Sequence, residues 1–410
     1  MNTNLDELKK KKVAIICPTL SRGGAERIVG LLSEQIEGSV DELFIFLFNS
    51  KEVTYKYKGK LVDLEFDNSS EPSKYRIVYL FNRVVVYFKL LLKLRSEKRK
   101  NGIDVSISFM DTPNILNVLS RTKDKVLLSV RINKSVQSTK HKISVSRRIE
   151  IRLMKILYRY SDKIIAISNG VRQDLISNFN LKEELVTTIY NFVDIKDIVN
   201  KKCEYLPEQY NDFFKNHDVI INVGRFEYQK NQLNLIDEFK LINKEFPNTR
   251  LVLVGKGTLE SRIMTKVNKL GLANKVLIVP YTSNPFMYMN KAKIFVLNSY
   301  YEGFGNVLLE AMACNVPIIS TDCKSGPREI ITGDFNYNNG TNEIEIFERG
   351  ILIPVRDDIN EEKHYLQRAV EILMSDPVLR KNIVDSATDY VQNGYSNQEI
   401  KKQWLNEIEL

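Results

Sequence analysis

Histidine and cysteine, which most often bind transition metals in proteins, are scarce in this sequence of 410 residues. The three histidines share no metal-ligand spacing, and the four cysteines include no C-x-x-C pair. Such isolated cysteines are typical of a reducing compartment, not of a disulfide framework or a zinc site. We therefore expect no bound metal, no cofactor and no structural disulfide.

Long apolar runs are also missing. Charged residues interrupt every apolar stretch before it reaches the length of a membrane-spanning helix. Residues 1–12 are polar and basic, and the apolar run that follows, residues 13–17, is too short for the core of a signal peptide. These absences predict a cytoplasmic protein.

Basic residues exceed acidic ones, and the formal net charge is +9. This excess favours an anionic partner, which could be nucleic acid, an acidic lipid surface or a phosphorylated substrate. We find no nucleic-acid-binding motif, so we expect no nucleic-acid partner. The length suggests two domains, and an apolar fraction of 43% is enough for two cores.

The most informative stretch is residues 298–321, NSYYEGFGNVLLEAMACNVPIIST. It predicts a strand end, a loop with Gly303 and Gly305, a helix, a stop at Pro317 and a new strand. A glycine loop that leads into a helix binds anions through backbone N–H groups and the helix dipole. With Glu302 and Glu310 nearby, the stretch suits a ligand with phosphates and hydroxyls, such as a nucleotide sugar. The alternative is an ordinary strand–loop–helix unit with two surface glutamates.

This stretch resembles the E-x7-E signature of retaining glycosyltransferases of family 4. The resemblance implies the GT-B fold, an α/β architecture in which two Rossmann-like parallel-sheet domains face each other across a cleft. It also implies transfer of a sugar from a nucleoside diphosphate, with UDP preferred, to a glycan acceptor. Residues 321–330 are similar to a sub-branch that builds bacterial surface polysaccharides such as capsule and lipopolysaccharide, which favours a lipid-linked acceptor.

Other family motifs occur in the expected order along the chain. The loop with Gly23 and Gly24 follows the first strand, and Ser168 follows a later strand of the same half. In the second half, Gly224, Arg225 and Lys230 resemble the diphosphate-binding loop, because two cations five residues apart can neutralise a diphosphate. The alternative for these cations is a solvated surface.

The resemblance implies a set of site residues. We assign the diphosphate to Arg225 and Lys230, the sugar hydroxyls to Glu302 and the ribose hydroxyls to Glu310. The remaining predicted contacts are Gly23, Gly24, Arg131, Ser168, Gly224, Gly255, Tyr281, Gly303, Phe304, Gly305, Asn306 and Val307. Arg131 stands where many relatives carry a histidine near the donor sugar, so no catalytic histidine is assigned.

Domain bounds follow from the same alternation of strands and helices. We predict a first domain at residues 1–196, a linker at 197–216 and a second domain at 217–396, with the last helix, 397–410, packing back on the first domain. Residues 75–100 and 146–160 are basic helices. They could lie on the inner face of an anionic membrane, or pack on the core with a solvated basic back.

Three other functions remain as alternatives. A nucleotide-sugar epimerase would need acid–base groups at the sugar, which the few histidines disfavour. A non-catalytic GT-B subunit should have lost part of the cation and glutamate set. Nucleic-acid binding is suggested by the net charge alone.

Overall fold

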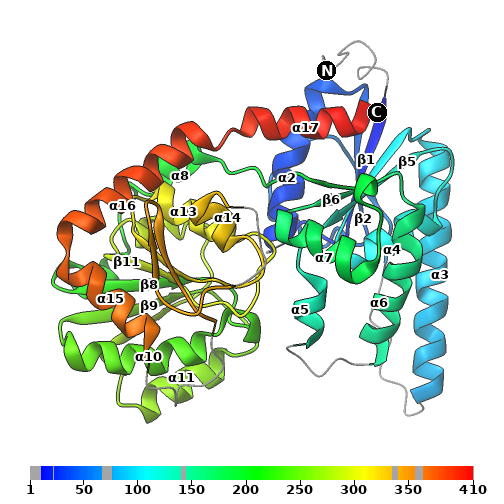
Figure 1. Ribbon diagram of the computed structural model, residues 1–410. Helices are drawn as coiled ribbons and strands as arrows, with labels where there is room; N and C mark the ends of the chain where they lie inside the picture. Colours follow the sequence, from blue (N-terminus) through cyan, green and yellow to red (C-terminus); the bar gives the residue numbers. More distant parts are fainter. Residues whose placement is uncertain are drawn as a thin grey trace. The chain divides into compact units, whose positions relative to one another are not determined.

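The computed structural model describes residues 11–21, 23–66, 76–139, 145–334, 340–355 and 363–409, without the side chains of residues 76–83 and 138–139. The chain divides into two compact units, residues 1–192 with 397–410, and residues 193–396 (Figure 1). Each unit is described by itself below. His141 and part of the basic helix predicted at residues 75–100 lie outside the described residues and side chains.

The first unit is built on a seven-stranded sheet with strand order β3-β2-β1-β4-β5-β6-β7, in which all pairs are parallel. Buried apolar runs form these strands because helices cover the sheet. The strands are β1 (Lys12–Cys17), β2 (Glu42–Leu47), β3 (Lys60–Asp63), β4 (Val105–Phe109), β5 (Lys125–Val130), β6 (Lys163–Ala166) and β7 (Val186–Thr188). The helices are α2 (Gly24–Ile36), α3 (Arg76–Lys100), α4 (Asp111–Leu119), α5 (Lys134–Thr139), α6 (Val145–Leu157), α7 (Asn169–Phe179) and α17 (Asn397–Glu409).

The last helix, α17, contacts α2 of the first unit. Its Trp404 is 1% exposed and stacks on Phe109, with ring centroids 6.1 Å apart. Lys125 donates a hydrogen bond of 2.5 Å to the carbonyl of Glu407. A buried aromatic pair therefore fixes this distant segment of sequence on the sheet of the first unit.

The second unit has a seven-stranded sheet with strand order β10-β9-β8-β11-β12-β14-β13, parallel except for the β13–β14 pair. Its strands are β8 (Asp218–Val223), β9 (Thr249–Val254), β10 (Val276–Val279), β11 (Ile294–Leu297), β12 (Ile318–Thr321), β13 (Glu345–Phe347) and β14 (Gly350–Ile353). Its helices are α8 (Ile195–Lys201), α9 (Glu208–Lys215), α10 (Gln232–Glu245), α11 (Glu260–Lys269), α12 (Phe286–Met289), α13 (Asn306–Ala313), α14 (Pro327–Thr332), α15 (Tyr365–Ser375) and α16 (Pro377–Asp389).

In each sheet the order in which strands are added reverses beside the first strand. In the second unit β8 lies between β9 and β11, and in the first unit β1 lies between β2 and β4. Doubly wound sheets bind ligands beyond the carboxyl ends of the strands at such a switch point. The two parallel-sheet α/β units predicted from the sequence are confirmed, and the β8–β11 switch point is where a donor site is expected.

The linker predicted at residues 197–216 is wrong. This segment contains most of α8 and all of α9, and it belongs to the second unit. Asp194 caps α8 by accepting from the backbone of Asp197, and Lys202 donates to Asn315 at 2.5 Å, just after α13. Helices of seven and eight residues contain only about two turns, so an apolar period is hard to recognise in the sequence and the segment resembles a linker.

Candidate donor site and its family

The loop between β11 and α13 is fixed by its neighbours. Glu302 donates its backbone N–H to the carbonyl of Lys324 at 3.0 Å and accepts from the N–H of Ser325 at 3.1 Å. A Cβ at Gly326 would lie 2.0 Å from the carbonyl oxygen of Phe304, so only glycine lets these two segments approach. Gly305, with φ +95°, precedes the helix in the left-handed region that favours glycine.

Glu302 is the centre of a hydrogen-bond network at the end of β11. Its side chain is buried, and its Oε1 accepts from Lys230 Nζ at 2.6 Å and from Ser299 Oγ at 2.6 Å. Gln229 Nε2 approaches the second carboxylate oxygen at 3.4 Å and donates to the carbonyl of Tyr301 at 2.8 Å. These hydrogen bonds therefore orient the carboxylate before any ligand arrives.

The two cations predicted to bind the diphosphate differ in their surroundings. Lys230 is mostly buried and paired with Glu302, whereas Arg225 is exposed and has no ion-pair partner among the described residues. The stem of Lys230 passes beside Gly224, where a Cβ would lie 3.4 Å from Lys230 Cε. The structure thus brings Lys230 and Glu302 together, and leaves Arg225 available to an anion.

Glycines also allow the loops after β8 and β9 to pack closely against each other. A Cβ at Gly255 would lie 2.1 Å from the carbonyl oxygen of Gly224, and one at Gly257 would lie 2.4 Å from that of Phe226. Phe226 is fully buried, so the backbone of the β8 loop cannot move away without opening the core. The position of Arg225 therefore depends on small residues in the β9 loop.

The remaining predicted residues of this unit lie around the same strand ends. Asn306 and Val307 form the half-buried first turn of α13, and Glu310 lies one turn further along. Phe304 is buried near Tyr395 and stays in the loop interior. The carbonyl of Gly303 accepts from Ser325 Oγ, and Tyr281, which follows β10, is 38% exposed.

The predicted residues of the first unit lie at the carboxyl ends of its strands. Gly23 caps α2, where a Cβ would collide with the carboxylate of Glu26 at 1.8 Å, and a Cβ at the exposed Gly24 would meet nothing within 4 Å. Arg131 lies over the Phe109 ring and hydrogen-bonds Asn191. Ser168 is fully buried and uses its hydroxyl to cap α7, accepting from Val171 at 3.2 Å.

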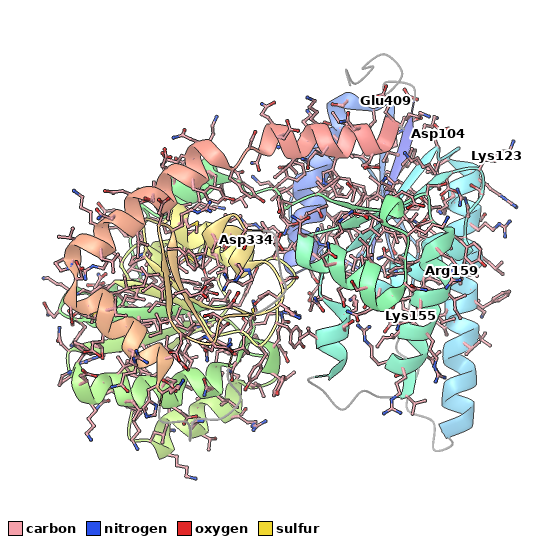
Figure 2. The ribbon with its side chains drawn as sticks, viewed as in Figure 1. Asp104, Lys123, Lys155, Arg159, Asp334 and Glu409 are labelled. Atoms are coloured by element: carbon pink, nitrogen blue, oxygen red, sulfur yellow. The ribbon has the colours of Figure 1, made fainter. Side chains whose placement is uncertain are left out.

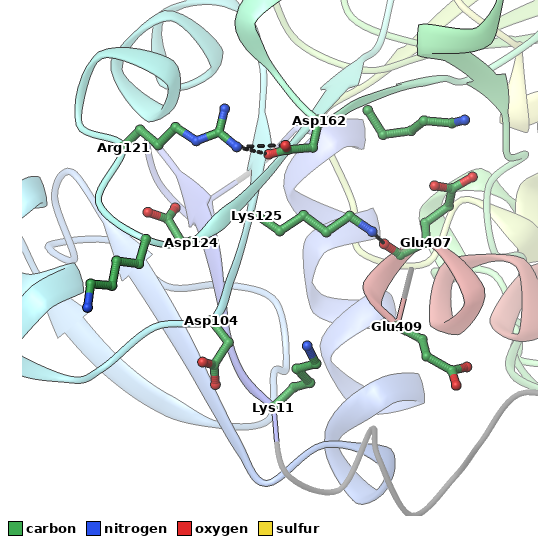
Figure 3. A pocket seen from close by; sticks show the side chains of 10 residues that line it. Lys11, Asp104, Arg121, Asp124, Lys125, Asp162, Glu407 and Glu409 are labelled. Atoms are coloured by element: carbon green, nitrogen blue, oxygen red, sulfur yellow. Dashed lines mark hydrogen bonds and ion pairs between the residues drawn. The ribbon is translucent and has the colours of Figure 1, made fainter.

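A charged pocket of about 560 Å³ lies on the first unit, at the edge of the sheet formed by the amino ends of the strands (Figure 3). It is lined by five basic and five acidic residues near the amino ends of the strands and on α17. Arg121 donates two hydrogen bonds to Asp162, at 2.6 and 2.5 Å. Because its charges balance and it lies away from the carboxyl ends, this pocket is not a candidate donor site.

Two family models match the chain. The model of Glycosyltransferase Family 4 matches residues 22–197, and the model of Glycosyl transferases group 1 matches residues 208–389. Together they span most of both units. The chain belongs to these glycosyltransferases.

Two curated relatives of this glycosyltransferase are named for the synthesis of bacterial glycans. An N-acetylgalactosamine-N,N'-diacetylbacillosaminyl-diphospho-undecaprenol 4-alpha-N-acetylgalactosaminyltransferase of Campylobacter jejuni is 28% identical over 377 residues, 90% of this chain and 92% of the relative. The capsular polysaccharide biosynthesis glycosyltransferase CapM of Staphylococcus aureus is 28% identical over 250 residues, 60% of each chain.

Solved structures share the fold of the glycosyltransferase. Sucrose-phosphate synthase of Thermosynechococcus elongatus matches with a TM-score of 0.74 at 17% identity, over 96% of this chain and 97% of that chain. HepE of Anabaena, in complex with UDP, matches with a TM-score of 0.69 at 17% identity, over 96% and 98%. At this identity the likeness shows the fold alone, and it confirms the predicted GT-B fold class.

Sequence reasoning missed several residues that shape the candidate site. Ser299 and Gln229 orient Glu302, and Gly326 allows the 302–305 loop to pack. Gln229 stands beside Lys230 in the sequence, which was its only signal. Ser299 carried none, because its role depends on a loop that folds back on itself.

Proposed function

We propose that this glycosyltransferase transfers a hexose or N-acetylhexosamine from a UDP-sugar donor to a lipid-linked glycan in the synthesis of a bacterial surface polysaccharide. We further propose that transfer retains the anomeric configuration and uses no metal ion. The donor side rests on the arrangement at the β8–β11 switch point. This arrangement consists of the exposed Arg225, the Lys230–Glu302 pair and the start of α13.

The main electrostatic task in this reaction is to stabilise the departing nucleoside diphosphate. Negative charge grows on the leaving oxygens as the sugar becomes oxocarbenium-like, and preorganised donors aimed at that charge lower the barrier. Arg225 and Lys230 would supply cationic donors, and the N–H groups at the start of α13 would supply helix-terminus donors. These groups can balance a diphosphate without a divalent cation.

The Lys230–Glu302 ion pair suggests how the donor is received. The phosphates would compete with Glu302 for the ammonium of Lys230, and the carboxylate would then accept hydrogen bonds from sugar hydroxyls. Ser299 and Gln229 keep the carboxylate in place during this exchange. Glu310, one helical turn into α13, is assigned to the ribose hydroxyls.

The choice of UDP, of the acceptor and of the location is supported by the relatives. HepE was solved with UDP, and the Campylobacter jejuni relative is named for an acceptor carried on diphospho-undecaprenol. A polyprenyl carrier stays in the membrane, so we place the enzyme at the inner face of the cell membrane as a peripheral protein. Among the described residues, no helix has the length and apolar content to cross a membrane.

The direct test is transfer by the purified enzyme from UDP- and GDP-sugars to an undecaprenyl-diphosphate-linked oligosaccharide, with and without EDTA. We expect one UDP-sugar to be used, EDTA to have no effect, and the anomeric signal of the product in the NMR spectrum to match that of the donor. Arg225→Ala and Lys230→Ala should each lower turnover by roughly 10²–10³, the cost of one lost preorganised donor.

Arg262→Ala is a matched control, since Arg262 is an exposed cation on α11 of the same unit. It should leave turnover unchanged. Near-normal rates in both site variants would refute the donor-site assignment. Binding of UDP without transfer would favour a non-catalytic subunit, and a new sugar epimer from donor alone would favour an epimerase.

A further inference from the structure

The outer face of α6 carries an apolar stripe that the fold leaves uncovered. Val145, Ile149, Leu153 and Ile156 are between 40% and 64% exposed, whereas large aliphatic side chains are usually buried. At 100° per residue these four positions fall within about 80° of the helix circumference. The exposure therefore forms one continuous stripe along the helix.

A basic stripe runs beside the apolar one. Arg148, Arg152, Lys155 and Arg159 are all exposed and occupy an adjacent arc of roughly 60°. Figure 2 labels Lys155 and Arg159. In the described part of the chain, neither Arg148 nor Arg152 has an ion-pair partner. The outer face of α6 is thus half apolar and half cationic.

On the inner face of the same helix, by contrast, the arginine forms ion pairs. Arg147 binds Asp111 of α4 at 2.8 Å and also pairs with Glu150. Tyr158, just after α6, is fully buried and meets Asn114 of α4 at 3.2 Å. The helix is therefore anchored to α4 by one side, and the uncovered side is not the result of poor packing.

A second helix of the first unit repeats the pattern. Val84, Phe88 and Leu92 of α3 recur every fourth residue and are between 52% and 67% exposed. The exposed Arg95 and Arg99 continue the same side of that helix. Both helices contact α4, so α3 and α6 belong to one layer of helices on the first unit (Figure 1).

We propose that the outer face of α6 docks on an anionic phospholipid surface, with its apolar stripe inserted at the interface and its basic stripe against the headgroups. Charge complementarity selects this occupant, because four exposed cations beside an apolar stripe, in a chain of net charge +9, match anionic headgroups above acyl chains. The inference rests on the proposed function and deepens it, since a lipid-linked acceptor is presented at such a surface.

The test measures binding to vesicles of phosphatidylcholine with and without phosphatidylglycerol by co-sedimentation. The intact enzyme should bind the anionic vesicles only, and added salt should weaken binding. Arg148→Glu/Arg152→Glu should lower the partition coefficient at least 25-fold, given about fivefold for each basic side chain. Ile149→Glu/Leu153→Glu should lower it at least about tenfold through lost insertion.

Two controls match these variants in chemistry and differ in place. Arg262→Glu/Lys269→Glu reverses two exposed cations on α11, and Met264→Glu/Val378→Glu adds two charges at exposed apolar positions of the second unit. Each should change binding by less than about threefold. Equal loss in the controls and the α6 variants would overturn the proposal, because net charge and not the α6 face would then govern binding.

Insertion is measured separately by the quenching of tryptophan fluorescence by brominated lipids in the variant Ile149→Trp. Trp404 is 1% exposed and stacked on Phe109, so it provides an unquenched internal reference. Quenching of the new tryptophan alone is expected, and its absence would overturn insertion. A dimer that becomes monomeric in Ile149→Glu/Leu153→Glu would instead assign the face to a second copy and refute lipid docking.

Vesicle binding is measured without donor or acceptor, so it can fail or succeed independently of sugar transfer. Transfer to a water-soluble acceptor should be unchanged in the α6 variants if the donor site is intact. Loss of that transfer together with loss of thermal stability would identify misfolding, and the single variants Arg152→Gln and Ile149→Gln then carry the same test with smaller changes.

Discussion

Two lysine–carboxylate pairs in this chain are chemically alike and differ in where the fold places them. Lys98 and Asp124 are completely buried near the amino end of β5, 2.8 Å apart. Lys230 and Glu302 are 2.6 Å apart at the carboxyl ends of β8 and β11, where 15% and 8% of the side chains remain exposed. The side chains of the first pair have no exposed surface, whereas those of the second pair keep some at the edge of the sheet where ligands bind.

The residues that surround each pair support the same distinction. Lys98 also donates to Asn117 at 2.6 Å, and Ser106 donates to Asp124 at 2.6 Å. Burial lowers the pKa of Lys98 to about 8. Burial by itself would raise the pKa of Asp124, but the charge of Lys98 and the hydrogen bonds from Lys98, Ser106 and the backbone of Thr122 together lower it. The side chains of Lys98, Ser106, Asn117 and Asp124 hydrogen-bond to one another, whereas the second pair lies beside glycine loops and Arg225, which has no ion-pair partner in the described part of the chain. The comparison teaches that the surroundings, and not the pair itself, mark the candidate site.

The largest expected effect is on stability, at the closed pair. Asp124→Asn keeps the shape of the side chain and leaves a buried ammonium without its counter-charge, which should cost about 3–5 kcal/mol of unfolding free energy. Urea denaturation measures this. The double variant Lys98→Met/Asp124→Asn should recover much of the loss, because it removes the unpaired charge. If the single and double variants were equally unstable, the charge would not be the cause.

The next effect separates the open pair from the closed one. Glu302→Gln should lower turnover by roughly 10²–10³, because a preorganised acceptor at the sugar is weakened. It should cost only about 1 kcal/mol of stability, since Lys230 can reach solvent. Paired measurements of turnover and urea denaturation check this. A variant that unfolds as readily as Asp124→Asn and keeps its turnover would mean that the Lys230–Glu302 pair is structural.

Much of this comparison could be predicted from sequence, because local patterns encode it. The apolar runs at residues 219–223 and 294–297 fixed two strands, and Gly224 and Gly303 marked the loops that follow them. The positions of Arg225, Lys230 and Glu302 beyond strand ends followed from those elements alone. Parallel strands that are covered on both faces have to be apolar, which makes them easy to recognise.

The rest depended on contacts between distant residues. Lys230 and Glu302 are 72 positions apart, and their pairing requires β8 and β11 to be neighbours in the sheet. The sequence showed that residues 146–160 are basic and helical, but not which side α4 would cover. The prediction of a linker at residues 197–216 differs from the structure for another reason. Helix α8 is stabilised by its N-terminal cap and by the hydrogen bond of Lys202, which leave no apolar period in the sequence.

A third pair, on the surface, should show the smallest effect and completes the comparison. Glu42 is held by Lys12 at 2.5 Å and by Lys60, and these hydrogen bonds lower its pKa from 4.5 to about 2. Since the folded state holds this carboxylate ionised more strongly than the unfolded chain does, the pair stabilises the fold above pH 4.5, and the contribution is lost as the pH falls towards 2. Glu42→Gln should therefore shift the urea midpoint slightly at pH 7 and less at pH 3. Salt should shrink even the shift at pH 7, because exposed charges are screened. A salt-insensitive loss as large as that of Asp124→Asn would contradict the ranking of the three pairs by burial.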